Sequence, residues 1–427
     1  MAQALGILAT ALVVVSLIHY YLWRRLVRDT TTSRRARRIG AWVLVGLVGL
    51  VVLTLVGSRV FPHNLAVVLS WPGYLWIAVM FYLVVCLAVL ELPRLVVRIV
   101  ERSRARAQRA ANAVVPEPAL VGASTVGGQA DTAHPEPPDH TPGPGDPASL
   151  AQATASRRVF LARTFAVSAG VAAVGLVGSG VQTALGPPQL KRVQLPLAKL
   201  PRTADGLRVA LISDIHLGPL RGYSHTRRIV DMVNGLDVDI VAIVGDLVDG
   251  SVEELGYAAS PLRELRSRDG AYFVTGNHEY FAGFQPWVDE IGSLGVRPLR
   301  NELVSLRGLD LAGVNDVTGS TYDDGPDFDA ALAGRDPSRA VVMLAHQPIQ
   351  AHQSVKYGVD LQLSGHTHGG QLVPFNLIVK ATGQPVVSGL GEVDGMPVYV
   401  TNGAGFWGPP VRVGAPPDIT LVELRSP

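Results

Sequence analysis

The stretch GHTHGG at residues 365–370 places two histidines, His366 and His368, between glycines, directly after the apolar run Leu361–Leu363. Alternate residues of an extended segment point to the same side, so we expect both imidazoles to reach one small volume. The glycines leave the backbone free to bend tightly around that volume. Two neighbouring neutral imidazoles are suitable ligands for a transition metal. Taken alone, the pattern fits a polar turn with surface histidines at least as well, and the rest of the chain decides between these interpretations.

Four further apolar runs also end in residues that can bind a metal. They are the runs Arg208–Ser213, Asp239–Val244, Ala271–Thr275 and Val341–Ala345, which are followed by DIH (214–216), GD (245–246), GNHE (276–279) and His346. Each motif alone is equally compatible with a surface turn. Catalytic residues of α/β folds gather beyond the carboxyl ends of strands, and five such ends in one chain are not expected by chance. The ordered set therefore predicts one functional site.

The region 190–427 is predicted to be an α/β domain. Its early strand-like runs are separated by helical patterns at Ser224–Asn234, Val252–Arg266 and Gln285–Leu294. Strands that alternate with helices indicate an α/β core. Later runs at Leu309–Val314, Val398–Thr401 and Ile419–Leu424 complete the set of expected strands. These later strands follow one another more closely, which suggests a second, mixed sheet packed on the first.

This ordered set of motifs resembles the calcineurin-like metallophosphoesterase family. The matching elements are DIH (214–216), GD (245–246), GNHE (276–279), the histidine in AHQP (345–348) and GHTH (365–368). The resemblance covers roughly residues 206–424, about half of the chain. It implies a two-sheet metallophosphoesterase sandwich flanked by helices. The sequence GHTHGGQ, together with an arginine pair upstream, is similar to a bacterial, exported and membrane-anchored branch of the family.

By position, the resemblance implies two metal sites that share one bridging carboxylate. Asp214, His216 and His368 would hold one divalent ion, Asn277, His346 and His366 would hold the second, and Asp246 would bridge both. Two ions about 3.5–4 Å apart polarise phosphoryl oxygens and supply a hydroxide near neutral pH, which attacks phosphorus in line. His278 is the candidate acid for the leaving group, and Asn277 would touch both metal and phosphate. Mixed His, Asp and Asn ligands without thiolates favour Mn, Fe or Zn over Ca.

Several nearby polar residues are not expected to bind metal. Glu279 is predicted to support its loop. Asp249 and Asp316 lie near strand ends but match no ligand motif. His225 and His352 are expected to be exposed helix residues.

Residues 1–109 are predicted to form a transmembrane region of three helices. The mean hydropathy of +0.27 is high for a soluble enzyme. The apolar runs Ala4–Trp23, Ala41–Gly57 and Leu65–Leu90 are each long enough to span a bilayer; buried core helices are the weaker alternative. Arginine-rich loops stay in the cytoplasm, so the loop 24–38 and the segment after residue 90 are predicted to lie inside. The N-terminus and the loop 58–64 are predicted to lie outside.

Residues 110–156 are predicted to be a disordered, proline-rich cytoplasmic linker, because the stretch Pro135–Pro147 shows no apolar periodicity. The segment 157–189 begins with the pair Arg157-Arg158 and continues into a moderately apolar run. It fits a twin-arginine export signal that stays as an anchor and a fourth transmembrane helix equally well. Both interpretations place the catalytic domain, residues 190–427, on the extracytoplasmic side of the cell membrane.

Composition excludes several classes of site. Cys86 is the only cysteine of the chain, which rules out a disulfide framework and a cysteine-based metal site. The formal net charge of +2 predicts no nucleic-acid partner.

The predicted function is a membrane-anchored, metal-dependent phosphoesterase that hydrolyses phosphodiester or pyrophosphate bonds. Aromatic residues follow the catalytic turns: Tyr280, Phe281, Phe284, Trp287, Phe375, Phe406 and Trp407. They fit core packing and an apolar rim for a lipid-linked substrate equally well, so the substrate is either a phosphorylated small molecule or a lipid. The export machinery of the twin-arginine pathway is a candidate partner. The alternatives are a non-catalytic membrane receptor that keeps the fold and a transporter whose spans are the active part.

Overall fold

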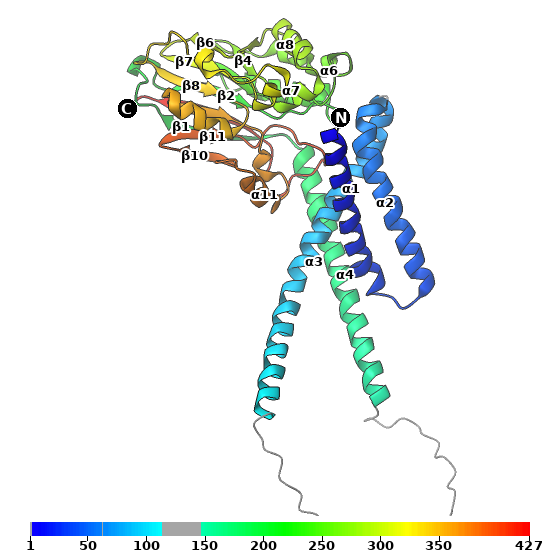
Figure 1. The fold of residues 1–427 in the computed structure, drawn as a ribbon. Coiled ribbons are helices and arrows are strands. Elements are labelled where there is room, and N and C mark those ends of the chain that lie inside the picture. The colour runs from blue at the N-terminus through cyan, green and yellow to red at the C-terminus, as the bar shows by residue number, and fades with distance from the viewer. Residues whose placement is uncertain (1, 62, 113–146) are drawn as a thin grey trace, which may run out of the picture. The chain divides into compact units, whose positions relative to one another are not determined.

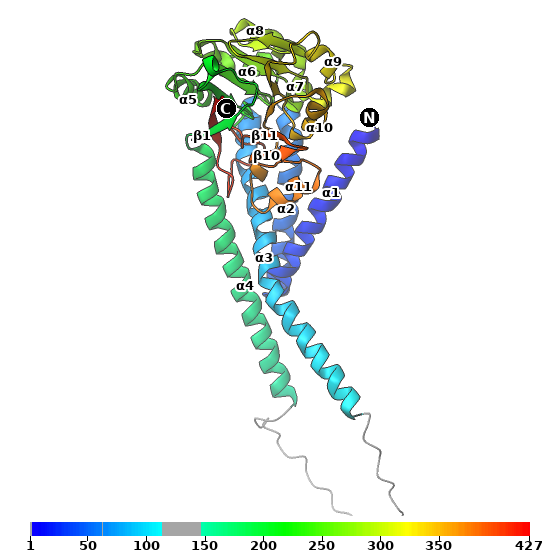
Figure 2. The same cartoon turned by 90° about the vertical axis from the view of Figure 1, so that its left-hand side faces the viewer.

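The computed structural model describes residues 2–61, 63–112 and 147–427 and is shown as a ribbon in Figures 1 and 2. Its contacts divide the chain into two compact units, Met1–Val48 with Met80–Ala173 and Gly49–Val79 with Val174–Pro427. The α-helices of the described residues are α1 (Ala2–Leu22), α2 (Arg34–Val60), α3 (His63–Asn112), α4 (Pro147–Leu185), α5 (Tyr223–Asn234), α6 (Val252–Ala259), α7 (Asn277–Ala282), α8 (Phe284–Ser293), α9 (Phe328–Ala331), α10 (Ala351–Ser354) and α11 (Phe375–Ala381). The strands are β1 (Gln189–Pro196), β2 (Leu207–Ile212), β3 (Ile240–Val244), β4 (Ala271–Val274), β5 (Arg297–Pro298), β6 (Glu302–Ser305), β7 (Leu309–Gly313), β8 (Ala340–Leu344), β9 (Leu361–Ser364), β10 (Gly389–Val393), β11 (Met396–Val400) and β12 (Asp418–Arg425).

Three helical segments within the described residues are long and apolar enough to cross a membrane. They are Arg34–Gly57, Leu65–Pro93 and Arg157–Leu185. These segments coincide with the second and third predicted spans and with the predicted signal anchor or fourth helix. The first predicted span coincides with α1 but is not among the three, so its crossing of a membrane stays a prediction.

Most of the predicted linker, including its stretch up to residue 146, lies outside the described residues. At its two edges, α3 continues to Asn112 and α4 begins at Pro147. Helices therefore extend into the predicted linker from both sides.

Glu91 is an acidic residue inside the apolar segment Leu65–Pro93. Its carboxylate accepts a hydrogen bond from the Tyr21 hydroxyl at 3.0 Å and pairs with Nη2 of Arg25 at 2.6 Å. These contacts join α1 to α3 within one unit. Both partners come from α1 or from the turn Trp23–Arg28 that follows it, so a contact between helices accounts for this acidic residue in an apolar segment.

Two six-stranded mixed sheets form the core of the second unit, in the orders β1-β12-β2-β3-β4-β5 and β10-β11-β9-β8-β7-β6. In the first sheet β2, β3 and β4 run parallel. In the second, β7, β8 and β9 run parallel. The arrangement confirms the predicted α/β class and the predicted second mixed sheet.

Period-2 alternation of apolar side chains explains why the two sheets pack face to face. In β2, Val209 and Leu211 point into the cluster between the sheets, where they meet side chains such as Leu344 of β8. Ala210 and Ile212 point the other way, into the cluster beneath α5, α6 and α8. Both faces of the strand are therefore buried, as its continuous apolar run predicts. The result is a four-layer sandwich, because α9 and α10 cover the outer face of the second sheet.

Strand β1 was not expected from the sequence. It pairs in parallel with β12 along its whole length, and most of its residues are exposed or half-buried. An edge strand contacts the core on one side only, so it needs no continuous apolar run. It begins directly after Gly186-Pro187-Pro188, which is all that separates it from the end of α4.

Candidate metal centre

The predicted ligands gather at the carboxyl ends of five strands. Asp214 and His216 follow β2, Asp246 follows β3, Asn277 and His278 follow β4, His346 follows β8, and His366 and His368 follow β9. The parallel strands of each sheet bring these ends to one edge, and packing of the two sheets brings the two edges together. Three overlapping groups of these side chains have ligand atoms within 4.8 Å of one another.

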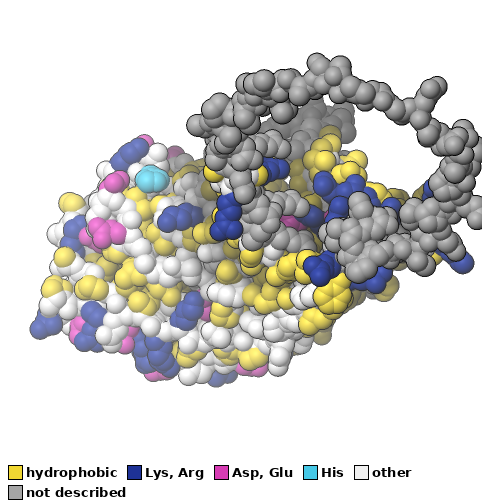
Figure 3. Space-filling view, turned by 90° about the horizontal axis from the view of Figure 1, so that it is seen from below, with side chains coloured by type: hydrophobic (Ala, Val, Ile, Leu, Met, Phe, Trp, Pro, Cys, Tyr) yellow, Lys and Arg dark blue, Asp and Glu magenta, His cyan; other side chains and the backbone are white. Residues whose placement is uncertain are grey.

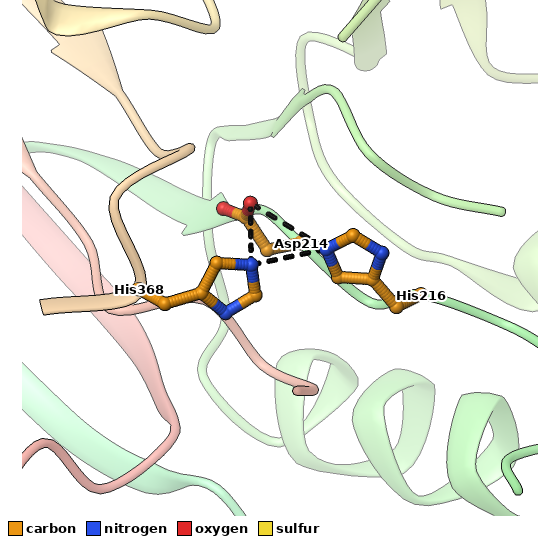
Figure 4. A group of neighbouring side chains, drawn as sticks. All are labelled: Asp214, His216 and His368. Atoms are coloured by element: carbon orange, nitrogen blue, oxygen red, sulfur yellow. Dashed lines mark hydrogen bonds and ion pairs between the residues drawn. The ribbon is translucent and has the colours of Figure 1, made fainter. Parts of the chain in front are cut away.

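The first group consists of Asp214, His216 and His368 (Figure 4). The two Nε2 atoms of His216 and His368 lie 3.0 Å apart. Oδ1 of Asp214 lies 3.3 Å from Nε2 of His368 and 3.9 Å from Nε2 of His216. One carboxylate and two imidazoles thus converge on one point, as three ligands of a shared ion would.

The second predicted ligand set consists of Asn277, His346 and His366, and its two histidines form one of the three groups together with Asp246. Oδ1 of Asn277 lies 3.2 Å from Nε2 of His346 and 3.0 Å from Nδ1 of His366. The two ring nitrogens are 3.2 Å apart. His346 also donates from Nδ1 to the Val244 carbonyl at 2.8 Å, which fixes its ring and directs Nε2 into the group.

Asp246 lies between the two groups. Its Oδ2 is 3.3 Å from Nε2 of His346 and 3.8 Å from Nε2 of His216. Its Oδ1 accepts a hydrogen bond from the backbone N–H of His278 at 2.9 Å. One carboxylate therefore reaches both groups, which is the position that a bridging ligand needs.

The backbone at these residues is held in an unusual conformation. Asp214, His216, Asp246, His366 and His368 have φ angles of 52°, 50°, 52°, 70° and 52°. Left-handed conformations of non-glycine residues cost on the order of 1–3 kcal/mol each and cluster at functional sites. Gly245 shows how tightly the turns are packed, because a Cβ there would lie 2.7 Å from Nδ1 of His346. The surrounding fold holds the donors close together at the expense of local strain.

The charges of the centre fit a cation. Burial alone would lower the pKa of His346, but the charges of Asp246 and Asp214 raise it well above its usual value. Burial would likewise raise the pKa of Asp246, yet the neighbouring histidines hold it well below its usual range. Positive charge on the histidines and negative charge on the carboxylates thus balance each other within the centre. Divalent cations would compete with protons for the same nitrogen and oxygen atoms, and the mixed N/O donor set suits transition metals.

Asp249 is the functional candidate that the sequence did not reveal. Its Oδ1 lies 2.8 Å from Nδ1 of His216 and 2.7 Å from Nδ1 of His278. Both rings therefore donate from Nδ1 to one oxygen, which leaves Nε2 of His216 facing the first group. Burial alone would raise the pKa of Asp249, but the two histidines hold it below its usual range. Its position three residues after Asp246, in the same loop, is the signal that could have indicated it.

His278 lies at the opening of the centre, and its side chain is 15% exposed. Its Nε2 is 4.0 Å from Oδ2 of Asp246. Burial alone would lower the pKa of His278, but the charge of Asp246 and the hydrogen bond to Asp249 outweigh it and raise the pKa to about 9. The ring therefore carries two N–H groups at neutral pH, and the one on Nε2 is not used by Asp249.

Three other polar residues that the sequence singled out do not join the donor groups. Glu279 accepts hydrogen bonds from the backbone N–H groups of Gly276, Asp246 and Leu247, so it supports the loops as predicted. Asp316 is buried and accepts from Gln347 Nε2 at 3.1 Å. His352 is exposed on α10, as predicted.

His225 was predicted to be exposed, and this prediction is wrong. It lies on the buried face of α5 together with Ile229 and Val233. The spacing of four residues between these positions marks one helix stripe and could have indicated burial. Burial and the nearby Arg221 lower the pKa of His225 to about 3, so the ring is neutral.

Arg412 supports the centre from beneath His368. Its Nη1 donates to the His368 carbonyl at 2.7 Å, and its Nη2 lies 2.9 Å from Nδ1 of the same ring. An arginine can only donate, so Nδ1 accepts and the ring proton lies on Nε2, directed at Asp214. Arg412 therefore fixes the orientation of the His368 ring, with Nε2 directed at Asp214 and the first group.

Arg412 is also attached to α4. Its backbone N–H donates to the Gly180 carbonyl at 2.9 Å. A Cβ at Gly180 would lie 2.5 Å from Val411 Cγ1 and 2.8 Å from Val413 Cγ2. The last turns of α4 therefore pack against the loop that holds Arg412 and belong to the same compact unit as the metal centre.

We expect Gly180→Leu to weaken metal binding by about 10–100-fold, the usual loss when the support of a ligand is displaced. The added side chain would push Val411 and Val413 outward and move Arg412 away from His368. Gly178→Leu is the matched control, because none of the described residues comes within 4 Å of a Cβ at that position. Metal dissociation constants of the two full-length variants test this prediction, and equal constants would contradict it.

The aromatic residues near the centre split into core and surface. Tyr280, Trp287 and Phe406 are buried, in agreement with core packing. Phe281 and Trp407 are 62% and 58% exposed. Their ring centroids lie 5.5 Å and 6.1 Å from that of His278. An apolar rim therefore flanks the candidate acid.

Comparison with known proteins gives consistent relatives. Residues 207–370 match the family model of calcineurin-like phosphoesterases. An uncharacterised metallophosphoesterase of Helicobacter pylori is 39% identical over 273 residues, which is 63% of this chain and 72% of that protein. An uncharacterised metallophosphoesterase of Aquifex aeolicus is 33% identical over 242 residues, 56% of this chain and 92% of that protein. A transmembrane protein with a metallophosphoesterase domain from Danio rerio is 40% identical over 261 residues, and the match spans 58% of this chain and 60% of the relative.

Proposed function

This chain belongs to the calcineurin-like metallophosphoesterase family and is a metal-dependent phosphoesterase, and we propose that it hydrolyses phosphodiester or pyrophosphate bonds with two divalent ions at the extracytoplasmic membrane surface. The observation that carries the proposal is the convergence of two donor groups on either side of Asp246. Asp214, His216 and His368 would hold one ion, and Asn277, His346 and His366 the other. Mn, Fe or Zn fits these donors.

The chain's own residues explain how a phosphoester would be cleaved. Bound divalent ions would supply polarisation of the phosphoryl oxygens and activation of a water. Asn277 is placed to orient the phosphoryl group beside its ion. Asp249 holds the ring of His278 by its Nδ1 proton. His278 keeps a second proton on Nε2, which the leaving oxygen would accept.

The membrane association rests on the apolar helices and on relatives described as transmembrane proteins. We propose that residues 1–109 form three spans, that residues 110–156 are a cytoplasmic linker and that residues 157–189 cross the membrane as a signal anchor or fourth helix. The arginine pair Arg157-Arg158 supports a twin-arginine address for the export machinery. Arginine asymmetry around the spans supports an outer position for residues 190–427.

The exposed rings of Phe281 and Trp407 favour a lipid-linked substrate over a soluble one. They offer apolar contact area next to a site for a polar phosphate, which suits a molecule with both parts.

A non-catalytic receptor is the alternative function. A receptor needs the fold but has no use for a charged, partly exposed His278 held by the Asp249 carboxylate. The full ligand set and this histidine therefore favour the enzyme.

Oriented membrane vesicles test both the reaction and its side of the membrane. Vesicles that carry the full chain with its outer face exposed should hydrolyse bis(p-nitrophenyl) phosphate, which does not cross the bilayer, once Mn, Fe or Zn is supplied. Inverted vesicles should do so only after permeabilisation. Hydrolysis by intact inverted vesicles alone would reverse the topology, and the absence of hydrolysis in every preparation, with metal bound, would favour the receptor.

A further inference from the structure

Helix α11 (Phe375–Ala381) exposes apolar side chains. Within this helix no residue is buried. Leu377 and Ile378 are 65% and 53% exposed, and Phe375 and the preceding Val373 are 39% and 38% exposed. Neighbouring exposed apolar side chains of this kind are typical of an interaction site and not of a solvent-facing surface. We call the set Val373, Phe375, Leu377, Ile378 and Trp407 the apolar face.

Hydrogen bonds and close contacts connect the apolar face to helices that are able to cross a membrane. The backbone N–H of Val373 donates to the Val413 carbonyl at 3.0 Å. Val413 packs against Gly180 of α4. In the same loop, a Cβ at Gly408 would lie 3.5 Å from Tyr74 of α3. All these residues belong to one compact unit, so the apolar face lies on the side of the domain that adjoins residues 174–185 of α4 and 65–79 of α3, which are parts of two segments able to cross a membrane.

The figures agree with this placement. Figures 1 and 2 both show α11 on the lower side of the two-sheet domain, the side from which α4 enters it. Figure 3 looks onto the molecule from below, and hydrophobic side chains are exposed there among polar and charged ones. The short connection Gly186-Pro187-Pro188 keeps the start of β1 within about 10–15 Å of the end of α4.

The apolar face also adjoins the metal centre. Gln371 follows the GHTHGG turn, and its side chain donates to the Trp407 carbonyl at 2.8 Å and accepts from the Trp407 N–H at 2.9 Å. Trp407 in turn flanks His278. The chain that leaves the metal centre therefore continues directly into α11.

We infer that the apolar face enters the interface of the bilayer in which the chain is anchored and presents phosphate groups of membrane lipids to the metal centre. A helix that lies in the interface inserts its apolar face about 5–10 Å into the boundary between headgroups and acyl chains. Lys380 in the last turn of α11 is suited to anionic headgroups. The partner that covers the apolar face in this inference is the lipid bilayer. The delivery of lipid phosphate rests on the proposed function, whereas the insertion of α11 does not.

Spin labelling of the full chain in proteoliposomes tests the insertion. Cys86 is the only cysteine, so Leu377→Cys in a Cys86→Ser background gives one label. Tyr257→Cys on α6 is the matched control, because Tyr257 is 76% exposed. We expect the label at position 377 to be accessible to oxygen, shielded from a water-soluble nickel complex and about 5–10 Å deep. The label at 257 should be accessible to nickel.

Equal nickel accessibility at both positions would overturn the inference. Shielding of position 377 from nickel and oxygen alike would also overturn it, because that result indicates a protein partner. The measurement does not depend on turnover. If the label at position 377 is buried but the protein shows no hydrolytic activity, the insertion of α11 stands and only the proposed function is rejected.

The delivery of lipid phosphate is tested by activity. The double substitution Leu377→Gln and Ile378→Gln should lower turnover of phosphodiester lipids in vesicles by about tenfold or more, since it removes two apolar contacts with the bilayer. Turnover of bis(p-nitrophenyl) phosphate should not change, nor should either activity in Tyr257→Gln. An equal loss with both substrates would overturn delivery by α11.

Discussion

Asp246→Asn should remove both metal ions and abolish turnover. Oδ2 of Asp246 faces Nε2 of His346 at 3.3 Å and Nε2 of His216 at 3.8 Å, so its charge serves both donor groups. An amide has the same shape but no charge, and it would place a donor or a weak acceptor between two cations. Loss of a partner that merely orients a ligand costs about 10–100-fold in metal affinity, and loss of the shared carboxylate should cost more than that. Elemental analysis of the purified full chain, together with turnover, measures both effects.

Asp310→Asn is the control for this prediction. Asp310 is equally buried, but it lies in β7 and binds Arg339 Nε at 2.8 Å, away from the metal centre. This variant should lose stability and keep its metals. Two ions retained by Asp246→Asn would reject the bridging position, and the loss of one ion would assign Asp246 to a single site.

The ligand types and their places at strand ends could be predicted because each depends on local sequence. An apolar run such as Asp239–Val244 indicates a buried strand, and the polar residue behind it marks the strand's end. The order of the strands within each sheet could not be predicted, since chain order alone does not say that β12 lies between β1 and β2.

The supports of the ligands could not be predicted in the same way. Asp249 meets His216 and His278 across 33 and 29 residues of sequence, and its place three residues after Asp246 indicates nearness to the site but not these two partners. Arg412 reaches His368 from a loop that contains no motif. These contacts arise from packing of distant segments, and only the folded chain shows them.

His278→Ala should lower turnover by about 10²–10⁴-fold while both metals stay bound, the usual loss when one positioned proton donor is removed. The predicted assignment leaves His278 out of both donor groups, although its ring lies within 4.8 Å of ligand atoms of His216 and Asp246, so we expect the ions to keep their ligands. Its Nε2 proton is held at neutral pH, because Asp246 and Asp249 outweigh burial and raise its pKa to about 9. Cations bound beside Asp246 would lower that pKa towards neutrality, where a group donates most effectively. Asp249→Asn should show part of the same loss, since an amide holds the ring less firmly.

The dependence on the leaving group distinguishes acid catalysis from a structural role. A nitrophenolate leaves without a proton, so the deficit of His278→Ala should be small with nitrophenyl diesters. An alkoxide needs the proton, and diesters with alkyl leaving groups should show the deficit in full. Turnover of mutant and wild type across diesters of rising leaving-group pKa gives this ratio directly, and metal content is measured on the same samples. A ratio that stays flat would mean that His278 positions the phosphate, and loss of an ion would make it a ligand.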